Sequence, residues 1–509
     1  MFVKESRNCS ELPGVPVRLV CRAPLPTAPG TRGRTGHAAQ RTLVAPVRTR
    51  RQGDRPVSAP TAQQVPQVAD RWSLVAVAGM LSFVAMLDMN IVNIALADVA
   101  DGFHISAQTA QWAVLGYQLP LVALLLPAGR WLDAVGTRPA VLTAVAGFAL
   151  GSVAAAAAPW AGALIAERVV QGAFGAVLFV LMPVLAMRSV RPQLRARVMS
   201  VPATLGPLGA VTGPAQGGLL LDHFGWRAIF LVKLPVCLAA WLLARRHVPA
   251  GGVLRAPGRA ELADAGLIGG SVAAVLLGLT LSADSVAWLL LAAPALPLVL
   301  WWLRRGGGRP VLAVLRENRT AGLNTAVLAV AAAFAVVHYL LALHLQRDEA
   351  ESATATGLTI LCFPLAMGIG GPLGGRLADR FGARSTATAG VALTAFGFLL
   401  LVPLGDSWSL PDVAWRLALA GAGMGLYGGP TQTLVMSAAT PATTATASST
   451  VQLARSLGFT LGPALATASW SLGGPGAAGL HTGIGLAAAG ACLAVVLLAS
   501  HGRPAARTA

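Results

Sequence analysis

Two short stretches of the chain carry the same charged pattern: "GRWLDAVGTR" at Gly129–Arg138 and "GRLADRFGAR" at Gly375–Arg384. Glycine, arginine, aspartate, glycine and arginine recur at identical spacing, although 55% of the 509 residues are hydrophobic. A charged decapeptide that occurs twice in an apolar chain indicates that the chain consists of two related halves.

The composition places the chain in a lipid bilayer. Charged residues make up 11% of it and the mean hydropathy is +0.66, whereas a soluble domain carries about 25% charged residues. The net charge of +18 could indicate nucleic acid, but the arginines lie between apolar blocks. We therefore expect lipid headgroups as the partner of these charges, no nucleic acid, and a multi-pass protein of the cell membrane.

The sequence lacks the motifs of common catalytic sites. Its two lysines, Lys4 and Lys233, do not end a GxxxxGK sequence, and no GxSxG or HExxH occurs. The five cysteines, at 9, 21, 237, 362 and 492, are scattered, which predicts no disulfide and no metal site. We expect no enzyme and no cofactor.

Residues 1–70 differ from the rest of the chain. They hold eleven lysines or arginines against four acids, many prolines and no apolar run long enough for a signal peptide. This composition predicts a disordered basic tail on the cytoplasmic side. A misplaced gene start is the alternative explanation.

Apolar blocks of about 18–25 residues, each enough to cross ~30 Å of hydrocarbon, fill the chain from residue 72 onward. Fourteen blocks are predicted: 72–96, 109–129, 140–158, 161–187, 198–220, 227–244, 263–282, 286–303, 321–345, 356–375, 385–404, 413–437, 450–471 and 479–499.

The connections between blocks support an even count. With the N-terminus inside, five inner loops hold 2, 4, 4, 5 and 3 lysines or arginines, and the outer loops together hold only Arg347. This asymmetry predicts that both termini are cytoplasmic.

Both decapeptides fall on the inner side, after the second helix of a six-helix set. Blocks 1–6 and 9–14 form the two sets, and blocks 7–8 are inserted between them. Two parallel repeats predict a transporter whose halves rock around a central site. The expected units are a six-helix bundle at 71–246, a linker with two extra helices at 247–320, a second bundle at 321–500 and a short cytoplasmic tail at 501–509.

Four motifs, which follow one another in the same order and on the same helices as in a known family, give the chain a resemblance to that family over about 72–500. They are "LDMNIVNIALA", the first decapeptide, "ERVVQGAFGA" and "GAVTGPAQGG". The sequence resembles the major facilitator superfamily, in its fourteen-helix drug:proton antiporter branch. Asn90 and Ala97 depart from the pattern of the first motif, and Ala134 and Thr137 replace two basic residues of the loop.

The resemblance implies an all-α membrane protein with the major facilitator fold, which exports amphiphilic compounds such as drugs or antibiotics by alternating access. Protons and a small-molecule substrate are then the partners, the proton gradient drives transport, and a monomer is expected. An importer or exporter of a small metabolite is the alternative. A membrane sensor would need a folded soluble domain, which the sequence does not indicate.

The decapeptides are predicted to form a conformational latch. Glycine permits a tight turn with φ > 0 and close approach, and each aspartate can accept from a helix N-terminus and pair with a loop arginine. Ordinary positive-inside charge with a helix cap is the simpler explanation. The residues are Gly129, Asp133, Gly136, Arg138, Gly375, Asp379, Arg380, Gly382 and Arg384.

The fifth block carries glycines at small-xxx-small spacing, which lets helices touch. The resemblance implies that this helix seals the interface between the halves, and a proline should bend it. The residues are Gly209, Gly213, Pro214, Gly217 and Gly218.

Ionisable residues inside the membrane are costly, and are therefore functional candidates. Asp88, with Arg168 as its counter-charge, is the predicted proton-coupling pair; a permanent structural ion pair is the alternative. Lys233 could reach the outer face, pair with Asp222 or Asp88, or face the cavity, which we favour. The pocket candidates are Asn93, Tyr117, Gln171, Lys233 and Arg455. His338 and His344 fit an interface or core better than a proton relay.

Overall fold

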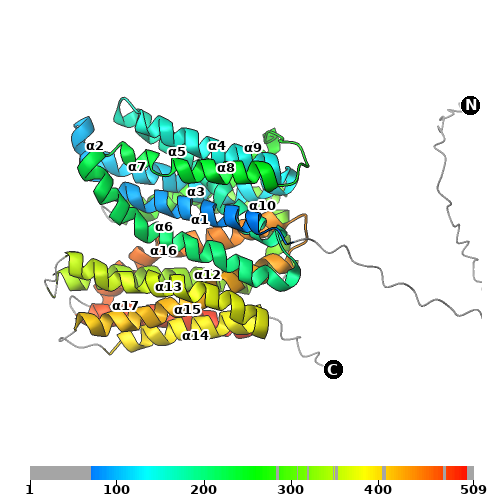
Figure 1. The fold of residues 1–509 in the computed structure, drawn as a ribbon. Coiled ribbons are helices and arrows are strands. Elements are labelled where there is room, and N and C mark those ends of the chain that lie inside the picture. Colours follow the sequence, from blue (N-terminus) through cyan, green and yellow to red (C-terminus); the bar gives the residue numbers. More distant parts are fainter. Residues whose placement is uncertain are drawn as a thin grey trace, which may run out of the picture. The chain divides into compact units, whose positions relative to one another are not determined.

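The computed structural model describes residues 70–281, 286–306, 308–317, 320–347, 349, 353–403, 409–473 and 477–500. Within these ranges the regular structure is helical, as the composition predicted (Figure 1). The basic tail expected at 1–70 lies outside the described residues apart from its last one, and the tail at 501–509 lies outside them entirely.

The first group of helices covers the first six predicted blocks. Its elements are α1 Trp72–Ile94, α2 Leu96–Phe103, α3 Ala107–Ala134, α4 Thr137–Ala156, α5 Ala161–Arg188, the 3-10 turn η1 Pro192–Leu194, α6 Arg195–Phe224, α7 Ala228–Leu231 and α8 Leu234–His247.

The inserted segment and the second group follow. The insert contains α9 Arg259–Leu281, η2 Val286–Ala292, α10 Ala295–Arg304, α11 Arg309–Leu312 and η3 Ala313–Glu317. The second group contains α12 Ala321–Arg347, α13 Ala353–Phe381, α14 Ala383–Leu401, α15 Leu410–Ala438, α16 Thr444–Gly473 and α17 Ala477–Ser500.

Each of the fourteen predicted blocks coincides with a described helix or a pair of helices. The sixth block is divided: α7 ends at Leu231 and α8 begins at Leu234, with Pro235 at its start. Proline has no N–H to continue a preceding helix, which explains the break. Lys233 lies at this break as the N-cap of α8. The eighth block is likewise split into η2 and α10, with Pro294 between them.

Nine of the described helices are long and apolar enough to cross a membrane by composition alone. Helices α6, α15 and α16 are not among these nine, although each has about 30 residues. Glycine, serine and threonine lower their hydropathy. These three helices lie where the two groups meet, so protein rather than lipid covers much of their surface.

Each group is built on a hydrophobic core, and the first core also takes in Met436 and Ala445 of the second group. The first core joins side chains of α1, α3, α4, α5, α6 and α8, and the second joins α12–α17. The groups meet where α6 packs on α13 and α15, and where α16 packs on α3 and α5. Figure 1 shows α6 and α13 running side by side along this boundary.

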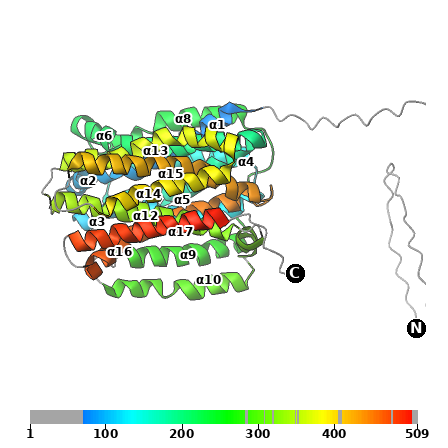
Figure 2. The same cartoon turned by 90° about the horizontal axis from the view of Figure 1, so that it is seen from below.

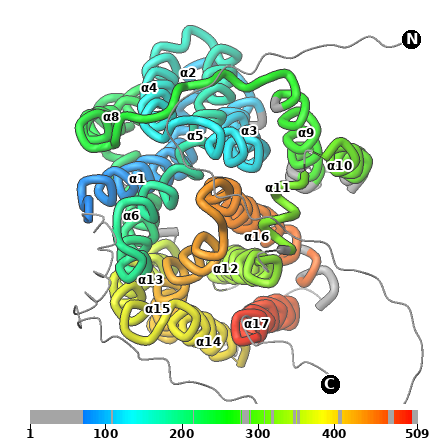
Figure 3. The backbone as a smooth tube through the Cα atoms, turned by 90° about the vertical axis from the view of Figure 1, so that its right-hand side faces the viewer, coloured from blue at the N-terminus to red at the C-terminus, as the bar shows by residue number. Residues whose placement is uncertain are grey.

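The inserted helices lie at the edge of the two groups. Helix α9 packs on α3 and α16, and α10 packs on α9. A small core of Leu126, Ile268, Trp302 and Val311 holds the insert in place. Figures 2 and 3 show α9 and α10 together at the periphery, so they do not separate the two groups.

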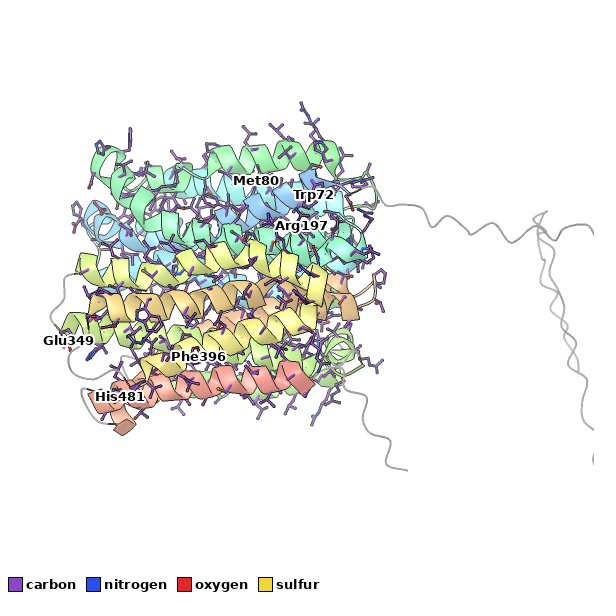
Figure 4. All side chains as sticks on the ribbon, turned by 60° about the horizontal axis from the view of Figure 1, so that its bottom comes forward. Trp72, Met80, Arg197, Glu349, Phe396 and His481 are labelled. Atoms are coloured by element: carbon purple, nitrogen blue, oxygen red, sulfur yellow. The ribbon has the colours of Figure 1, made fainter. Side chains whose placement is uncertain are left out.

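The two ends of the bundle follow the predicted alternation of loops. Trp72 and Arg197, predicted inside, lie at one end in Figure 4, and Glu349 and His481, predicted outside, lie at the other. Which end faces the cytoplasm remains a prediction from the positive loops. We call the end with Trp72 and Arg197 the repeat end, because both decapeptides lie there.

Candidate functional site

A cluster of three charged side chains is buried inside the first group. Asp88 on α1 and Lys233 at the α7–α8 break are 0% exposed, and Arg168 on α5 is 1% exposed. One carboxylate oxygen of Asp88 accepts from Arg168 Nη1 at 2.9 Å, and the other accepts from Lys233 Nζ. Asp88 therefore bridges two cations, of which the sequence analysis expected the arginine.

Neutral groups complete the surroundings of Arg168. Its Nε donates to the backbone oxygen of Ala113 at 2.8 Å, and Nη1 also donates to Gln171 Oε1 at 2.5 Å. The amide of Gln171 donates in turn to Ser152 Oγ at 2.6 Å. Gln171 thus orients the arginine, which in turn reaches Asp88.

Aromatic rings enclose the two cations. The guanidinium of Arg168 lies 4.3 Å from the centroid of the Tyr117 ring, and Lys233 Nζ lies 5.4 Å from the rings of Phe148 and of Phe230. Such contacts stabilise a desolvated cation by about 2 kcal/mol or more. They help to accommodate a cluster with one negative and two positive charges.

A cavity lies between the two groups. Side chains of α1, α5, α6, α13, α15 and α16 line it. Its wall contains Ser82, Met86, Phe179, Met182, Pro183, Met199, Pro202, Ala203, Gly206, Pro207, Met367, Met424, Tyr427, Gly428, Gly429, Gln432, Gln452, Arg455 and Phe459.

Of the five predicted pocket residues, Arg455 lines this cavity. Tyr117, Gln171 and Lys233 belong to the buried charge cluster instead, which corrects the prediction that Lys233 faces the cavity. The proline-induced break directs Lys233 into the first group, where Asp88 compensates its charge. The prediction that Asn93 lines the pocket is also wrong: Asn93 is exposed, and its amide donates to the backbone oxygen of Met89.

The methionines of the cavity wall were missed by the sequence analysis. Five of the chain's ten methionines line the cavity, from α1, α5, α6, α13 and α15. Each lies on a different helix, so no local spacing in the sequence could have revealed them. Flexible, polarisable methionine side chains suit a surface that adapts to ligands of different shape.

The first decapeptide connects the two groups at the repeat end. The carboxylate of Asp133, near the end of α3, accepts from the backbone N–H groups of Ala445 and Thr446, both at 2.9 Å. It also accepts from the Thr446 hydroxyl at 2.6 Å. These donors form the first turn of α16, so Asp133 caps a helix N-terminus of the other group.

The second decapeptide makes the matching contact in the opposite direction. Asp379, near the end of α13, faces the start of α6, where the backbone amide and the charge of Arg197 act on its carboxylate. Each repeat therefore places its aspartate at the start of a helix of the other group.

The first glycine of each decapeptide permits this close approach. Gly129 and Gly375 lie inside helices, so the predicted tight turn is wrong for them. A Cβ on Gly129 would lie 2.6 Å from Ser449 Cβ, and one on Gly375 would lie 2.9 Å from Arg197 Cα. Of the second glycines, Gly382 has the positive φ of 88°, whereas Gly136 has φ −66°.

The last arginine of each decapeptide does not pair with the aspartate, which corrects the sequence prediction. Arg138 donates to the backbone oxygen of Arg245 at 2.7 Å, at the end of α8. Arg384 donates to the backbone oxygens of Leu498 and Ala499, at the end of α17. Both arginines thus cap the last helix of their own group.

Two further arginines of the repeats have other contacts. Arg130 pairs with Asp264 of α9 at 2.5 Å and so ties the insert to the first group. Arg380, predicted to belong to the latch, lies 5.3 Å from the ring centroid of Phe381. The contact between the groups therefore depends on the aspartates and the close-packed glycines rather than on these arginines.

The glycines of α6 face α1 of the same group. A Cβ on Gly209 would lie 3.1 Å from the backbone carbon of Phe83, and one on Gly213 would lie 3.2 Å from the amide nitrogen of Ile91. Gly217 contacts Ile91 as well, whereas a Cβ on Gly218 would meet nothing within 4 Å. Close packing is thus present, but these glycines pack within the first group, although α6 itself also lies at the interface between the groups, as predicted. Pro214 lies within the uninterrupted helix α6.

A different part of α6 forms the interface between the groups. Gly371 of α13 lies against Thr204, and Gly429 of α15 lies against Ser200. Among the residues that the structure describes, the hydrogen bonds between the groups lie between the repeat end and the cavity. Beyond those of Asp133 and Asp379, they join Ser448 to Val180, Gln452 to Phe179 and Arg188 to Pro441.

The two block-nine histidines do not join the charge cluster. The His338 ring lies 3.9 Å from that of Phe334 and 4.8 Å from that of Phe363, between centroids. His344 Nε2 lies 3.6 Å from a carboxylate oxygen of Glu349. In the described part of the chain, no three His, Cys, Asp or Glu side chains gather as metal ligands would.

Two groups of membrane-crossing helices, related by a repeated motif and packed around a shared cavity, define a multi-pass membrane transporter. The model of the Major Facilitator Superfamily matches residues 78–463 and, in a second overlapping match, residues 322–509. The chain therefore belongs to the major facilitator superfamily, in its drug:proton antiporter branch.

Individual relatives and a solved structure agree with this assignment. The chain is 31% identical over 396 residues to the multidrug resistance protein Stp of Mycobacterium tuberculosis, covering 75% of this chain and 73% of that protein. It is 30% identical over 435 residues to the probable actinorhodin transporter of Streptomyces coelicolor, covering 80% and 73%. The human organic anion transporter MFSD10 shares the fold, with a TM-score of 0.61 at 16% identity over 84% of this chain and 99% of that one.

The contacts of Asp133 give a testable prediction about the closed repeat end. Asp133→Asn removes the charge and one acceptor, and a hydrogen bond to a charged group contributes about 1.5–3 kcal/mol. We expect the repeat end to open more often, by roughly tenfold. The measurement is the rate at which a membrane-impermeant thiol reagent, added at the repeat end, labels Ala203→Cys in the cavity wall.

Asp412→Asn is the matched control, because Asp412 lies at the start of α15 and contacts Ser409 and Arg416 of its own group. A background with the native cysteines replaced removes labelling elsewhere. Equal labelling rates with and without Asp133→Asn would show that this carboxylate does not hold the end closed.

Proposed function

We propose that the chain is a proton-coupled exporter of amphiphilic organic compounds that works by alternating access. The observation that carries the proposal is Asp88, a fully buried carboxylate held by Arg168 and Lys233 on the helix that also forms part of the cavity wall. Ser82 and Met86 of α1 line the cavity, and Asp88 lies less than one turn beyond Met86.

The charge of this cluster changes when a proton binds. Protonation of Asp88 would remove the negative charge between two cations, which would then repel each other at low dielectric constant. Arg168 keeps its proton, since a guanidinium is not deprotonated in proteins. Three packed elements, α1, α5 and α8, meet at the cluster. Their packing would therefore differ between the protonated and the deprotonated state, as a coupling site requires.

The arrangement of the groups fits one state of an alternating cycle. Asp133 and its partners in α16 close the repeat end, for which the positive loops predict a cytoplasmic orientation. We infer that the structure corresponds to a state in which the cytoplasmic end is closed. Opening that end requires the contacts of both decapeptides to break.

The class of substrate is suggested by the cavity and by the relatives. The wall is mostly apolar and rich in methionine. Relatives at 31% and 30% identity are named as a multidrug resistance protein and an actinorhodin transporter. Both observations favour an amphiphilic organic compound over a polar nutrient.

The test is an export assay in an efflux-deficient bacterial host, with a panel of fluorescent compounds and a protonophore. Cells that express the chain should accumulate less of some compounds, and the protonophore should abolish the difference. Export that persists without a proton gradient would contradict the proposed coupling. Uptake instead of export would support the alternative, a transporter that imports a small metabolite.

A further inference from the structure

The cavity wall contains one charged side chain, Arg455 of α16, among the 19 described residues that form it. Its Nη1 donates to Gln452 Oε1 at 3.1 Å. A guanidinium carries five N–H donors, so this neutral partner engages a small part of its capacity. Tyr427, on the facing helix α15, lines the same part of the wall.

Arg455 differs from Arg168, the buried arginine of the first group. Arg168 has the Asp88 carboxylate at 2.9 Å, but no ion pair joins Arg455 to an acid among the residues that the structure describes. The sequence explains this. Helices α12–α17 contain only two acids, Asp379 and Asp412, which lie near helix ends.

Arg455 is partly exposed, and the largely apolar wall offers it no carboxylate among the described residues. Leaving such a charge uncompensated is costly, and a ligand that brings a negative charge removes the cost. The guanidinium fork matches a carboxylate with two parallel hydrogen bonds. The methionines and phenylalanines of the wall can receive the apolar remainder of such a ligand.

The position of Arg455 also connects a ligand to the interface between the groups. Gln452, which accepts from Arg455, donates through its amide to the backbone oxygen of Phe179 on α5, at 3.3 Å. A ligand bound to the guanidinium would compete with Gln452 for it. Binding of a charged ligand would then affect the hydrogen bond between Gln452 and Phe179, which joins the two groups.

We propose that the cavity selects organic anions: amphiphiles that carry a carboxylate or another acidic group, with Arg455 as their counter-ion. This inference rests on the proposed function only in taking the cavity as the substrate site. It predicts a preference for anionic over cationic compounds of the same shape.

The probes are fluorescein, an anion, and rhodamine 123, a cation with the same three-ring skeleton. Binding to the purified full-length protein in nanodiscs is measured by fluorescence anisotropy, without a proton gradient. The protein should bind fluorescein more tightly. Arg455→Gln should weaken fluorescein binding by at least about tenfold and leave rhodamine 123 binding equal or stronger, since one lost charge-assisted pair costs about 1.4 kcal/mol or more.

Two further variants separate charge from structure. Arg455→Lys keeps the charge but loses the fork, so fluorescein binding should fall less than in Arg455→Gln. Arg416→Gln is the control, because Arg416 pairs with Asp412 outside the cavity and its loss should change neither dye. Folded protein is checked by gel filtration and thermal unfolding for each variant.

A preference for rhodamine 123 in the unaltered protein would overturn the inference, as would equal weakening of both dyes by Arg455→Gln. The test is independent of coupling. A charge preference without protonophore-sensitive export would contradict the proposed function alone, and export without a charge preference would contradict this inference alone.

Discussion

Replacing Asp88 by asparagine should abolish proton-driven export, because the amide keeps the shape of the side chain and loses its charge and its proton. The same change leaves Arg168 and Lys233 buried without their common anion. Removing one partner of a buried pair costs about 3–5 kcal/mol, so we expect less folded protein as well. Lys233 can reduce this cost by releasing its proton, which Arg168 cannot do.

A second substitution distinguishes coupling from folding. Lys233→Met leaves Asp88 and Arg168 as a balanced pair, and Asp88→Asn/Lys233→Met leaves a single cation. We expect the double variant to recover folded protein but not export against a gradient. The measurement is transport driven by a pH gradient in liposomes, normalised to folded protein. Wild-type coupling in the double variant would show that Asp88 is a structural residue and does not carry the proton.

Lys233→Met by itself identifies the group that exchanges the proton. If Asp88 does so, this variant should still couple transport to the gradient, with an altered rate. Arg168→Lys should impair coupling strongly, because an ammonium group cannot reach Asp88, Gln171 and the backbone oxygen of Ala113 together. Complete loss of coupling in folded Lys233→Met would instead point to Lys233 as the proton carrier.

Gly209→Ala should destabilise the first group by about 1–3 kcal/mol, the usual cost of overpacking. Its Cβ would lie 3.1 Å from the Phe83 backbone carbon and 3.2 Å from the Leu87 amide nitrogen, and closer still to the Phe83 carbonyl oxygen. Backbone atoms cannot move aside as a flexible side chain can, so α1 and α6 must separate. Gly209→Val should leave little folded protein.

Gly218→Ala is the matched control on the same helix, because nothing lies within 4 Å of its added Cβ. Alanine favours a helix over glycine by about 0.5–1 kcal/mol, so this variant should be as stable as the unaltered protein or more so. Thermal unfolding in detergent measures both. Equal unfolding temperatures for Gly209→Ala and Gly218→Ala would contradict the close contact between α1 and α6.

The sequence predicted the helical segments well, because a bilayer imposes a length and a hydropathy on each segment separately. Every predicted block coincides with a helix or a pair of helices in the described residues, and the duplicated decapeptide showed which helices correspond in the two groups. Local chemistry was also readable: the aspartate of the first repeat caps a helix start, as its position suggested.

The partners of the polar side chains were less predictable. Lys233 was expected in the cavity, yet it pairs with Asp88. Helix α6 lies between the groups as expected, but its glycines face α1 of their own group. The loop arginines cap helix ends of their own group instead of pairing with the aspartates. In each case the residue type was informative, but its partner lay on a helix far away in the sequence.

The sequence by itself indicated the helical segments, the two repeats and a rare carboxylate inside an apolar segment, since each depends on the local hydropathy and spacing of one segment. The tertiary structure decided which side chains share a cavity and which share a charge cluster, because rotating a helix about its axis changes its neighbours without changing its hydropathy. A helix that faces protein on several sides has no single apolar stripe to fix that rotation. Packing against the other helices fixes it, and that packing leaves Arg455 in the cavity without an acid while Arg168 meets Asp88.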